Sequence, residues 1–126
     1  GTVLRAKEFT APPIPGRVVA ILGDTRYCPQ SVELARSANV VVHEATFDGE
    51  LEHLAHQYHH STAQQAAAVA REAEAHALIL THFSTRYRQG DVERMVEKVR
   101  EIFPNAHAAE DFWRFPVTCA AVDAGK

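Results

Sequence analysis

The sequence has little cysteine, no long apolar run and no excess of basic residues, and each absence excludes a class of protein. Its two cysteines, Cys28 and Cys119, lie far apart and form no paired motif, so a disulfide-stapled scaffold is not expected. No stretch reaches the ~18 apolar residues of a membrane span, and no basic segment precedes a short apolar one as in a secretory leader. These absences predict a cytoplasmic protein with no membrane segment.

The balance of charge is slightly acidic. The 126 residues carry a formal charge of −3 at pH 7, and the pI is about 6.2. Proteins that grip nucleic acid through a broad electrostatic face are normally basic, so only a local basic patch is compatible with this composition. With 46% hydrophobic residues, the chain can build one core, since a chain of this length buries roughly two-thirds of its unfolded surface.

Strand-like and helix-like segments alternate along the chain, which is typical of α/β proteins. Continuous apolar runs and one short terminal run predict strands within residues 17–22, 39–45, 76–83 and 105–112. Helical periodicity and capping residues predict helices within residues 29–38, 61–75 and 89–103. Ser61 or Thr62 is expected to cap the second helix. Because the strands are apolar throughout, both faces of the sheet are expected to be covered.

The remaining stretches have weaker patterns. Residues 1–16 resemble an edge strand or extended arm that ends in a proline-rich linker, and residues 118–126 resemble a flexible polar tail. Residues 47–60 are polar and histidine-rich, and mix weak helix with loop. The folded domain is therefore placed at residues 17–117.

Ionisable side chains follow each of the four predicted strands. In order along the chain they are Asp24, the pair His43 and Glu44, His82, and the pair Glu110 and Asp111. In an α/β sheet, ligands bind at the carboxyl ends of the strands. Four contributions to one edge predict a functional site there.

Asp24 and His82 are candidate metal ligands. A carboxylate has two oxygens and can bridge two hard cations, and a neutral imidazole on a rigid strand end suits zinc or manganese. Each residue also has a structural interpretation: Asp24 as the cap of the following helix, and His82 as a hydrogen-bonded core histidine.

His43 and Glu44 point to opposite sides of their strand, so only one of them can face the site. The sequence around them does not match HExxH, because Phe47 stands where the second histidine belongs. Glu44 could orient a neighbouring histidine. A polar strand end is the alternative.

Five of the eight histidines fall between residues 43 and 60. His53 and His56 share a helical face and could form a separate metal site, although loops rarely hold ligands rigidly. His60 directly precedes a strong helix cap and could donate a proton to a leaving oxygen. The helix dipole disfavours an imidazolium there unless an acid lies nearby. His59 is the rival proton donor, and spacing does not separate the two.

Polar residues continue after His82. Arg86 can contact phosphate with two donors at once, or it can form an ordinary surface ion pair. Tyr87 could stack on a base or pack against the core.

Five motifs together resemble the C-terminal half of ribonuclease Z, the tRNA 3′-processing endonuclease of the metallo-β-lactamase superfamily. They are "GDTRYC", "VVVHEATF", "HHSTAQQAA", "LILTHFSTRY" and "AAEDF", and the match runs from about Val18 to about Val117. The resemblance implies an α/β fold that forms the C-terminal half of an αββα sandwich. It also implies a dinuclear zinc site, with manganese as a possible substitute.

The resemblance assigns roles to individual residues. It implies that Asp24 bridges both metals and that His82 ligates one of them. It implies that His60 is the proton donor, with Glu44 as its acidic partner.

The implied reaction is hydrolysis of a phosphodiester in precursor tRNA, which releases the 3′ trailer and leaves a 3′ hydroxyl. Arg86 is expected near the scissile phosphate, with Ser84 assisting. The metal ions would polarise the phosphodiester and activate a water. The resemblance also favours a homodimer.

The chain departs from the family in one important respect. It contains no HxHxDH string, which supplies most of the metal ligands, and no exosite arm. With only Asp24 and His82 matched, the two-zinc centre cannot be completed, since zinc needs about four ligands per ion. We therefore expect the second half of a longer protein, inactive by itself. The alternatives are another phosphodiesterase of the superfamily and a non-catalytic dimerising scaffold.

Overall fold

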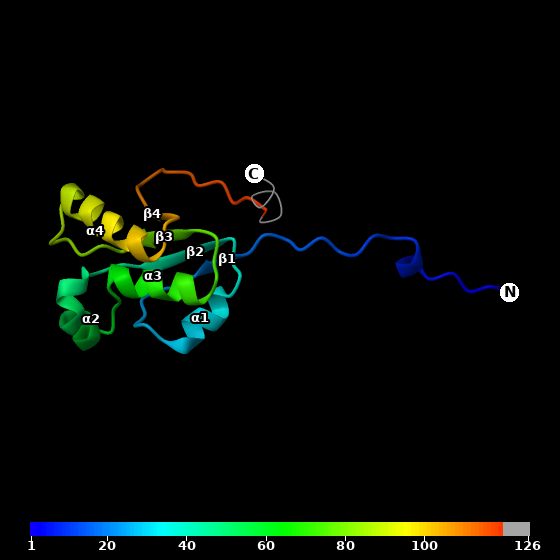
Figure 1. Cartoon of the computed structure of the whole chain (residues 1–126), viewed down its shortest axis with the longest axis horizontal. Helices are drawn as coiled ribbons and strands as arrows, with labels where there is room; N and C mark the ends of the chain where they lie inside the picture. The colour runs from blue at the N-terminus through cyan, green and yellow to red at the C-terminus, as the bar shows by residue number, and fades with distance from the viewer. Residues whose placement is uncertain (120–126) are drawn as a thin grey trace.

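The computed structural model describes residues 1–119, in which four parallel strands form one sheet (Figure 1). The strands are β1 (Val19–Ile21), β2 (Val40–Glu44), β3 (Leu78–Thr81) and β4 (Ala106–Ala108). The helices are α1 (Pro29–Ala35), α2 (Glu52–Tyr58), α3 (Ala63–Glu72) and α4 (Gln89–Ile102), with short 3-10 turns η1 (Ala6–Glu8) and η2 (Gly49–Leu51). The predicted alternation of strands and helices is confirmed.

The strands lie side by side in chain order, β1-β2-β3-β4. Each neighbouring pair is parallel, with Val19 opposite Val40, and Val42 opposite Ile79. Parallel neighbours need a crossover, and α1, α3 and α4 lie within the three crossovers. The carboxyl ends of all four strands therefore lie along one edge of the sheet.

The main hydrophobic core lies between the sheet and helices α1, α3 and α4. Alternate strand residues enter it, including Ala20, Val41, Leu78 and Leu80, as the two-residue period of a strand requires. Helix α3 contributes mostly alanines, which are fully buried. Small side chains allow this helix to lie close to β2 and β3, with which it makes direct contact.

The expectation that both faces of the sheet are covered is wrong for β1. On the face away from the helices, Phe115 and Val117 pack around a small cluster that includes Val40 and Ile79. On β1, in contrast, Val19 is 46% exposed and Ile21 is 70% exposed. The reason is that the segment after β4 packs against β2 and β3 and does not shield the outward side chains of the edge strand.

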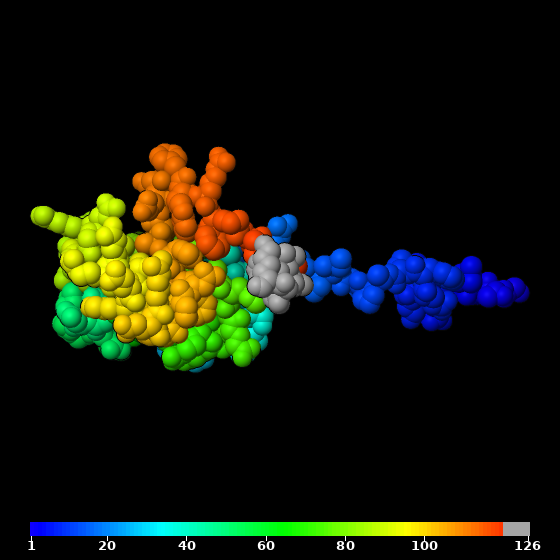
Figure 2. All heavy atoms as spheres, turned by 45° about the horizontal axis from the view of Figure 1, so that its top comes forward, coloured from blue at the N-terminus to red at the C-terminus, as the bar shows by residue number. Residues whose placement is uncertain are grey.

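The N-terminal residues form an extended arm and not an edge strand. They are exposed throughout and contain only the 3-10 turn η1, and they project away from the body of the molecule (Figures 1 and 2). A strand requires the backbone groups of a neighbour, and the arm has no neighbouring strand in the described chain. The predicted tail at 118–126 lies outside the described residues from position 120 onward. Within residues 1–119, no helix combines the length and apolar character needed to cross a membrane.

Candidate active site

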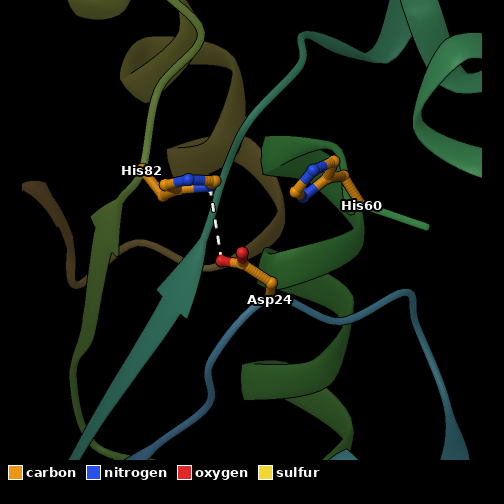
Figure 3. Close-up of side chains that lie close together, drawn as sticks. All are labelled: Asp24, His60 and His82. Atoms are coloured by element: carbon orange, nitrogen blue, oxygen red, sulfur yellow. Dashed lines mark ion pairs between the residues drawn. The ribbon is translucent and has the colours of Figure 1, made fainter. Parts of the chain in front are cut away.

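Asp24, His60 and His82 converge at the carboxyl edge of the sheet (Figure 3). Asp24 lies in the turn after β1, His82 directly follows β3, and His60 precedes α3. One potential ligand atom from each side chain lies within 4.8 Å of those of the other two. The Oδ1 atom of Asp24 is 3.6 Å from Nδ1 of His82. The structure therefore brings together the two residues predicted as metal ligands, and adds His60 to them.

The chemistry of these three side chains suits a divalent metal ion. A carboxylate and two imidazoles are the oxygen and nitrogen ligands that zinc and related ions use. The side chains of Asp24 and His82 are 67% and 50% exposed, and that of His60 is 22% exposed, so an ion can reach them. Three ligands are nevertheless fewer than two four-coordinate ions require.

His82 adopts a left-handed backbone conformation with φ of 58°, which is unfavourable for a residue with a side chain. One backbone hydrogen bond on each side of His82 holds the chain in this conformation. The amide of Ala45 donates to the carbonyl of Thr81 at 2.8 Å, and the amide of Ser84 donates to the carbonyl of Thr46 at 3.0 Å. Such local strain at a candidate ligand is typical of functional sites.

His60 is held between the ends of two helices. Helix α2 ends at Tyr58, and His59 follows it with a left-handed φ of 62°. The amide of His60 donates to the carbonyl of Ala55 at 2.8 Å, which closes the helix as in a Schellman motif. Helix α3 then begins with a capping box between Thr62 and Gln65. His59 is exposed, whereas His60 faces Asp24 and His82. Geometry thus separates two histidines that spacing left equivalent.

Glu44 is the acidic neighbour of His60. Its side chain is only 1% exposed, and a buried carboxylate is costly unless hydrogen bonds satisfy it. The amide of Thr25 donates to it at 2.7 Å, the amide of Ser61 at 3.1 Å and the hydroxyl of Thr46 at 2.5 Å. His60 Nδ1 lies 3.0 Å from the same carboxylate. The ring of His60 is therefore oriented by a carboxylate that is itself fixed by three donors.

The hydroxyl of Thr46 links the two histidines of the site. Because its single proton goes to Glu44, it must accept from Nδ1 of His82, which lies 3.0 Å away. His60 likewise donates from Nδ1 to Glu44, since a carboxylate can only accept. Within residues 1–119, neither imidazole then has a hydrogen-bond partner at Nε2. Histidine ligands of metals commonly donate their second ring N–H to such a partner.

His43 points away from the site, as the alternation along β2 predicts. It is fully buried, and its Nδ1 donates to the backbone carbonyl of Glu44 at 2.8 Å. Burial lowers the pKa of His43 below its usual value, so this histidine is neutral near pH 7. Of the two residues, Glu44 alone faces the cluster.

Arg86 lies next to the site through an aromatic contact. Its guanidinium carbon is 5.4 Å from the centre of the Phe47 ring, a cation–π distance. The rings of Phe47 and His60 pack in a T-shaped arrangement with centroids 6.4 Å apart. The hydroxyl of Ser84 accepts a hydrogen bond from the amide of Arg86 at 3.4 Å. Ser84 thus shapes the turn that carries Arg86.

Asp48 connects this turn to the helices behind it. Its carboxylate accepts from Gln64 at 2.8 Å and from Lys98 at 2.9 Å, and its amide donates to the hydroxyl of Tyr87 at 2.8 Å. Burial raises the pKa of Asp48, but hydrogen bonds from Lys98, Gln64 and the Gly49 amide outweigh this effect and hold it below its usual value. Tyr87 therefore helps to fix the turn after β3 by its hydroxyl as well as by its packing against the core.

Two groups of predicted residues do not join the site. Glu110 and Asp111 were expected at the same edge of the sheet, but they line a separate cleft against α4. The chain turns away after β4, and Phe112 takes a left-handed φ of 63° within that turn. Within residues 1–119, His53 and His56 belong to no group of three or more potential metal ligands.

Sequence reasoning missed Thr46 and Phe47 as parts of the site. Thr46 lies two residues after Glu44, so the two-residue period of an extended chain could have placed both on one side. For Phe47 the sequence carries no such signal, because its contact with Arg86 joins segments that are 39 positions apart in the printed sequence.

Comparison with known families and relatives gives a consistent result. The family profile described as "Beta-lactamase superfamily domain" matches residues 9–83. Among curated relatives, the chain is 52% identical over 117 residues to ribonuclease Z of Anoxybacillus flavithermus, and 51% identical over the same length to ribonuclease Z of Bacillus cereus. Each match covers 93% of this chain and 38% of the relative. The chain thus spans well under half the length of these relatives.

Solved structures share the fold. A metallo-beta-lactamase fold protein from Bacillus subtilis superimposes with a TM-score of 0.66 at 19% identity, covering 75% of this chain and 38% of that chain. The short form of human tRNase Z superimposes with a TM-score of 0.62 at 33% identity, covering 82% of this chain and 35% of that chain.

Proposed function

The chain belongs to the beta-lactamase superfamily, and on that premise we propose that it is the C-terminal part of a ribonuclease Z-type endoribonuclease that removes the 3′ trailer of precursor tRNA. The observation that supports this most directly is the cluster of Asp24, His60 and His82 within 4.8 Å, with the buried carboxylate of Glu44 behind it. Similarity to ribonucleases Z over 93% of the chain supports the substrate.

Asp24 and His82 are the proposed metal ligands, and zinc is the proposed metal, with manganese as the alternative. When bound at such a site, metal ions supply polarisation of a phosphoryl oxygen and activation of water. The short coverage of the relatives, 38% of their length, supports the view that the remaining ligands come from outside this chain. The chain by itself is therefore proposed to be inactive.

His60 is the proposed proton donor to the departing 3′ oxygen. To act, it must carry protons on both ring nitrogens, and the Glu44 carboxylate 3.0 Å from Nδ1 accepts the hydrogen bond from that nitrogen. With Nδ1 held by Glu44, the proton on Nε2 is the one available for transfer. The donors from Thr25, Thr46 and Ser61 keep the Glu44 carboxylate in place throughout.

Arg86 is the proposed contact to the scissile phosphate, with Ser84 as its positioning residue. The stacking of Arg86 on Phe47 holds the guanidinium near His60, and its planar donors suit two phosphate oxygens at once. We further propose a cytoplasmic homodimer, as for the family that the sequence resembles.

The test is cleavage of precursor tRNA by the complete protein, meaning this chain together with the remainder that its longer relatives possess. We expect a mature tRNA with a 3′ hydroxyl and a released trailer. The isolated 126-residue chain, supplied with zinc, is expected to cleave nothing, because the centre lacks ligands.

Two results would contradict the proposal. Turnover of bis-p-nitrophenyl phosphate without cleavage of precursor tRNA would indicate another phosphodiesterase of the superfamily. Cleavage by the isolated chain above that of its His82→Ala variant would show that these residues alone form a working centre.

A further inference from the structure

A cleft opens next to His60, between the loop that follows β1 and helix α2. Its volume is about 900 Å³, and the residues that line it include Arg26, Tyr27, Glu52, His53, His56 and His60. His60 is the one member of the candidate metal cluster that lines this cleft; Asp24 and His82 do not. His60 therefore belongs both to the candidate metal cluster and to the wall of the cleft.

The lining chemistry suits an unpaired nucleotide. Tyr27, His53 and His56 offer flat rings, and Arg26 offers a guanidinium, all on exposed side chains. Proteins bind single-stranded nucleic acid by stacking bases on such rings and placing cations near the phosphates. A cleft for an apolar ligand would instead be lined mainly by hydrophobic side chains.

A hydrogen bond to α3 positions Tyr27 at the wall of the cleft. Its hydroxyl donates to Oε2 of Glu72 on α3 at 2.5 Å, which ties the loop to the helix, while the residue stays 38% exposed. The hydrogen bond to Glu72 also raises the pKa of Tyr27 above its usual value, so the phenol remains protonated and the contact persists near neutral pH.

The direction of the reaction decides which nucleotide the cleft receives. A cut that leaves a 3′ hydroxyl expels the O3′ atom of the nucleotide on the 5′ side of the scissile bond. A general acid must lie within hydrogen-bond reach of the oxygen that it protonates, so this nucleotide must lie against His60. Because His60 lines the cleft, the cleft is the hollow next to that nucleotide.

We infer that the cleft is the subsite for the nucleotide that keeps the new 3′ hydroxyl, with its base stacked on Tyr27 and its 5′ phosphate near Arg26. This inference rests on the proposed function, because it uses the position of the departing oxygen. It assigns to Tyr27, a residue with no part in the metal cluster, a role in substrate binding.

The test compares variants of the complete protein on a precursor substrate. Tyr27→Ala is expected to raise KM by about tenfold, which is the effect of losing one base–aromatic contact, with kcat little changed. Tyr27→Phe keeps the ring but loses the hydrogen bond to Glu72, so its KM should lie between those of Tyr27→Ala and the unsubstituted protein. Tyr58→Ala is the matched control, because Tyr58 is 58% exposed on the neighbouring helix and is not among the residues that line the cleft. Thermal unfolding of each variant checks that the fold is intact.

Substrates that lack one base identify the nucleotide. Removing the base on the 5′ side of the cut should raise KM for the unsubstituted protein and abolish the effect of Tyr27→Ala. Removing the base on the 3′ side of the cut should leave the rise in KM caused by Tyr27→Ala unchanged. An unchanged KM in a folded Tyr27→Ala variant would overturn the subsite, and so would an effect that disappears only with the 3′-side base. If the unsubstituted protein cleaves no precursor at all, the proposed function fails, and the subsite with it.

Discussion

Replacing His60 by alanine in the complete protein is expected to lower turnover of precursor tRNA by a factor of ~100 or more, as for loss of a general acid. The metal content should not change. Turnover should fall because Nδ1 of His60 faces Glu44 at 3.0 Å, which orients the ring for proton transfer, and metal should remain because Asp24 and His82 are the proposed ligands. Single-turnover cleavage and elemental analysis of the same preparation measure both quantities.

The metal measurement is decisive because the geometry also permits His60 to be a ligand. Its ligand atom lies within 4.8 Å of those of Asp24 and His82. A loss of metal together with activity would make His60 a ligand and contradict its assignment as proton donor. His59→Ala is the matched control: this neighbour is exposed, and its replacement should leave turnover close to that of the unsubstituted protein.

Replacing Asp24 by alanine should empty at least one metal site and abolish turnover. Asp24 would hold the metal ions through its carboxylate oxygens, so its loss would weaken their binding. Asp24→Asn, which keeps the shape but removes the charge, should bind metal more weakly than the unsubstituted protein. Elemental analysis after dialysis against a chelator provides the measurement. A full metal complement in Asp24→Ala would exclude the bridging role.

Much of the site follows from the sequence because the sheet is parallel and its strands are ordered as in the chain. Under those conditions, residues that follow successive apolar runs must meet at one edge. Asp24 and His82 lie together for this reason. The same rule places Glu44 at the edge and His43 in the core, since neighbours on a strand face opposite sides.

The rule fails where the chain bends after the strand. Glu110 and Asp111 follow β4 just as His82 follows β3, but the turn around Phe112 directs them to a cleft beside α4. No pattern in the sequence indicates a left-handed residue at Phe112. The choice between His59 and His60 is similar, because it depends on which of them closes α2 with a positive φ.

The role of Thr46 also cannot be predicted from sequence patterns. Its hydroxyl joins Glu44 and His82, and those contacts exist only after β2 and β3 have paired and their ends have turned. The expectation that both faces of the sheet are covered was wrong for β1 for a related reason. Apolar runs indicate that a strand can be buried, but they do not say which segment buries it, and Ile21 on β1 is left 70% exposed.

The most direct test of this account is an anomalous diffraction map of the zinc-loaded complete protein, recorded at the zinc absorption edge. If Asp24 and His82 are metal ligands, a metal peak is expected at about 2.0–2.2 Å from both a carboxylate oxygen of Asp24 and a ring nitrogen of His82, the usual zinc bond lengths. Metal peaks that involve neither side chain would contradict it.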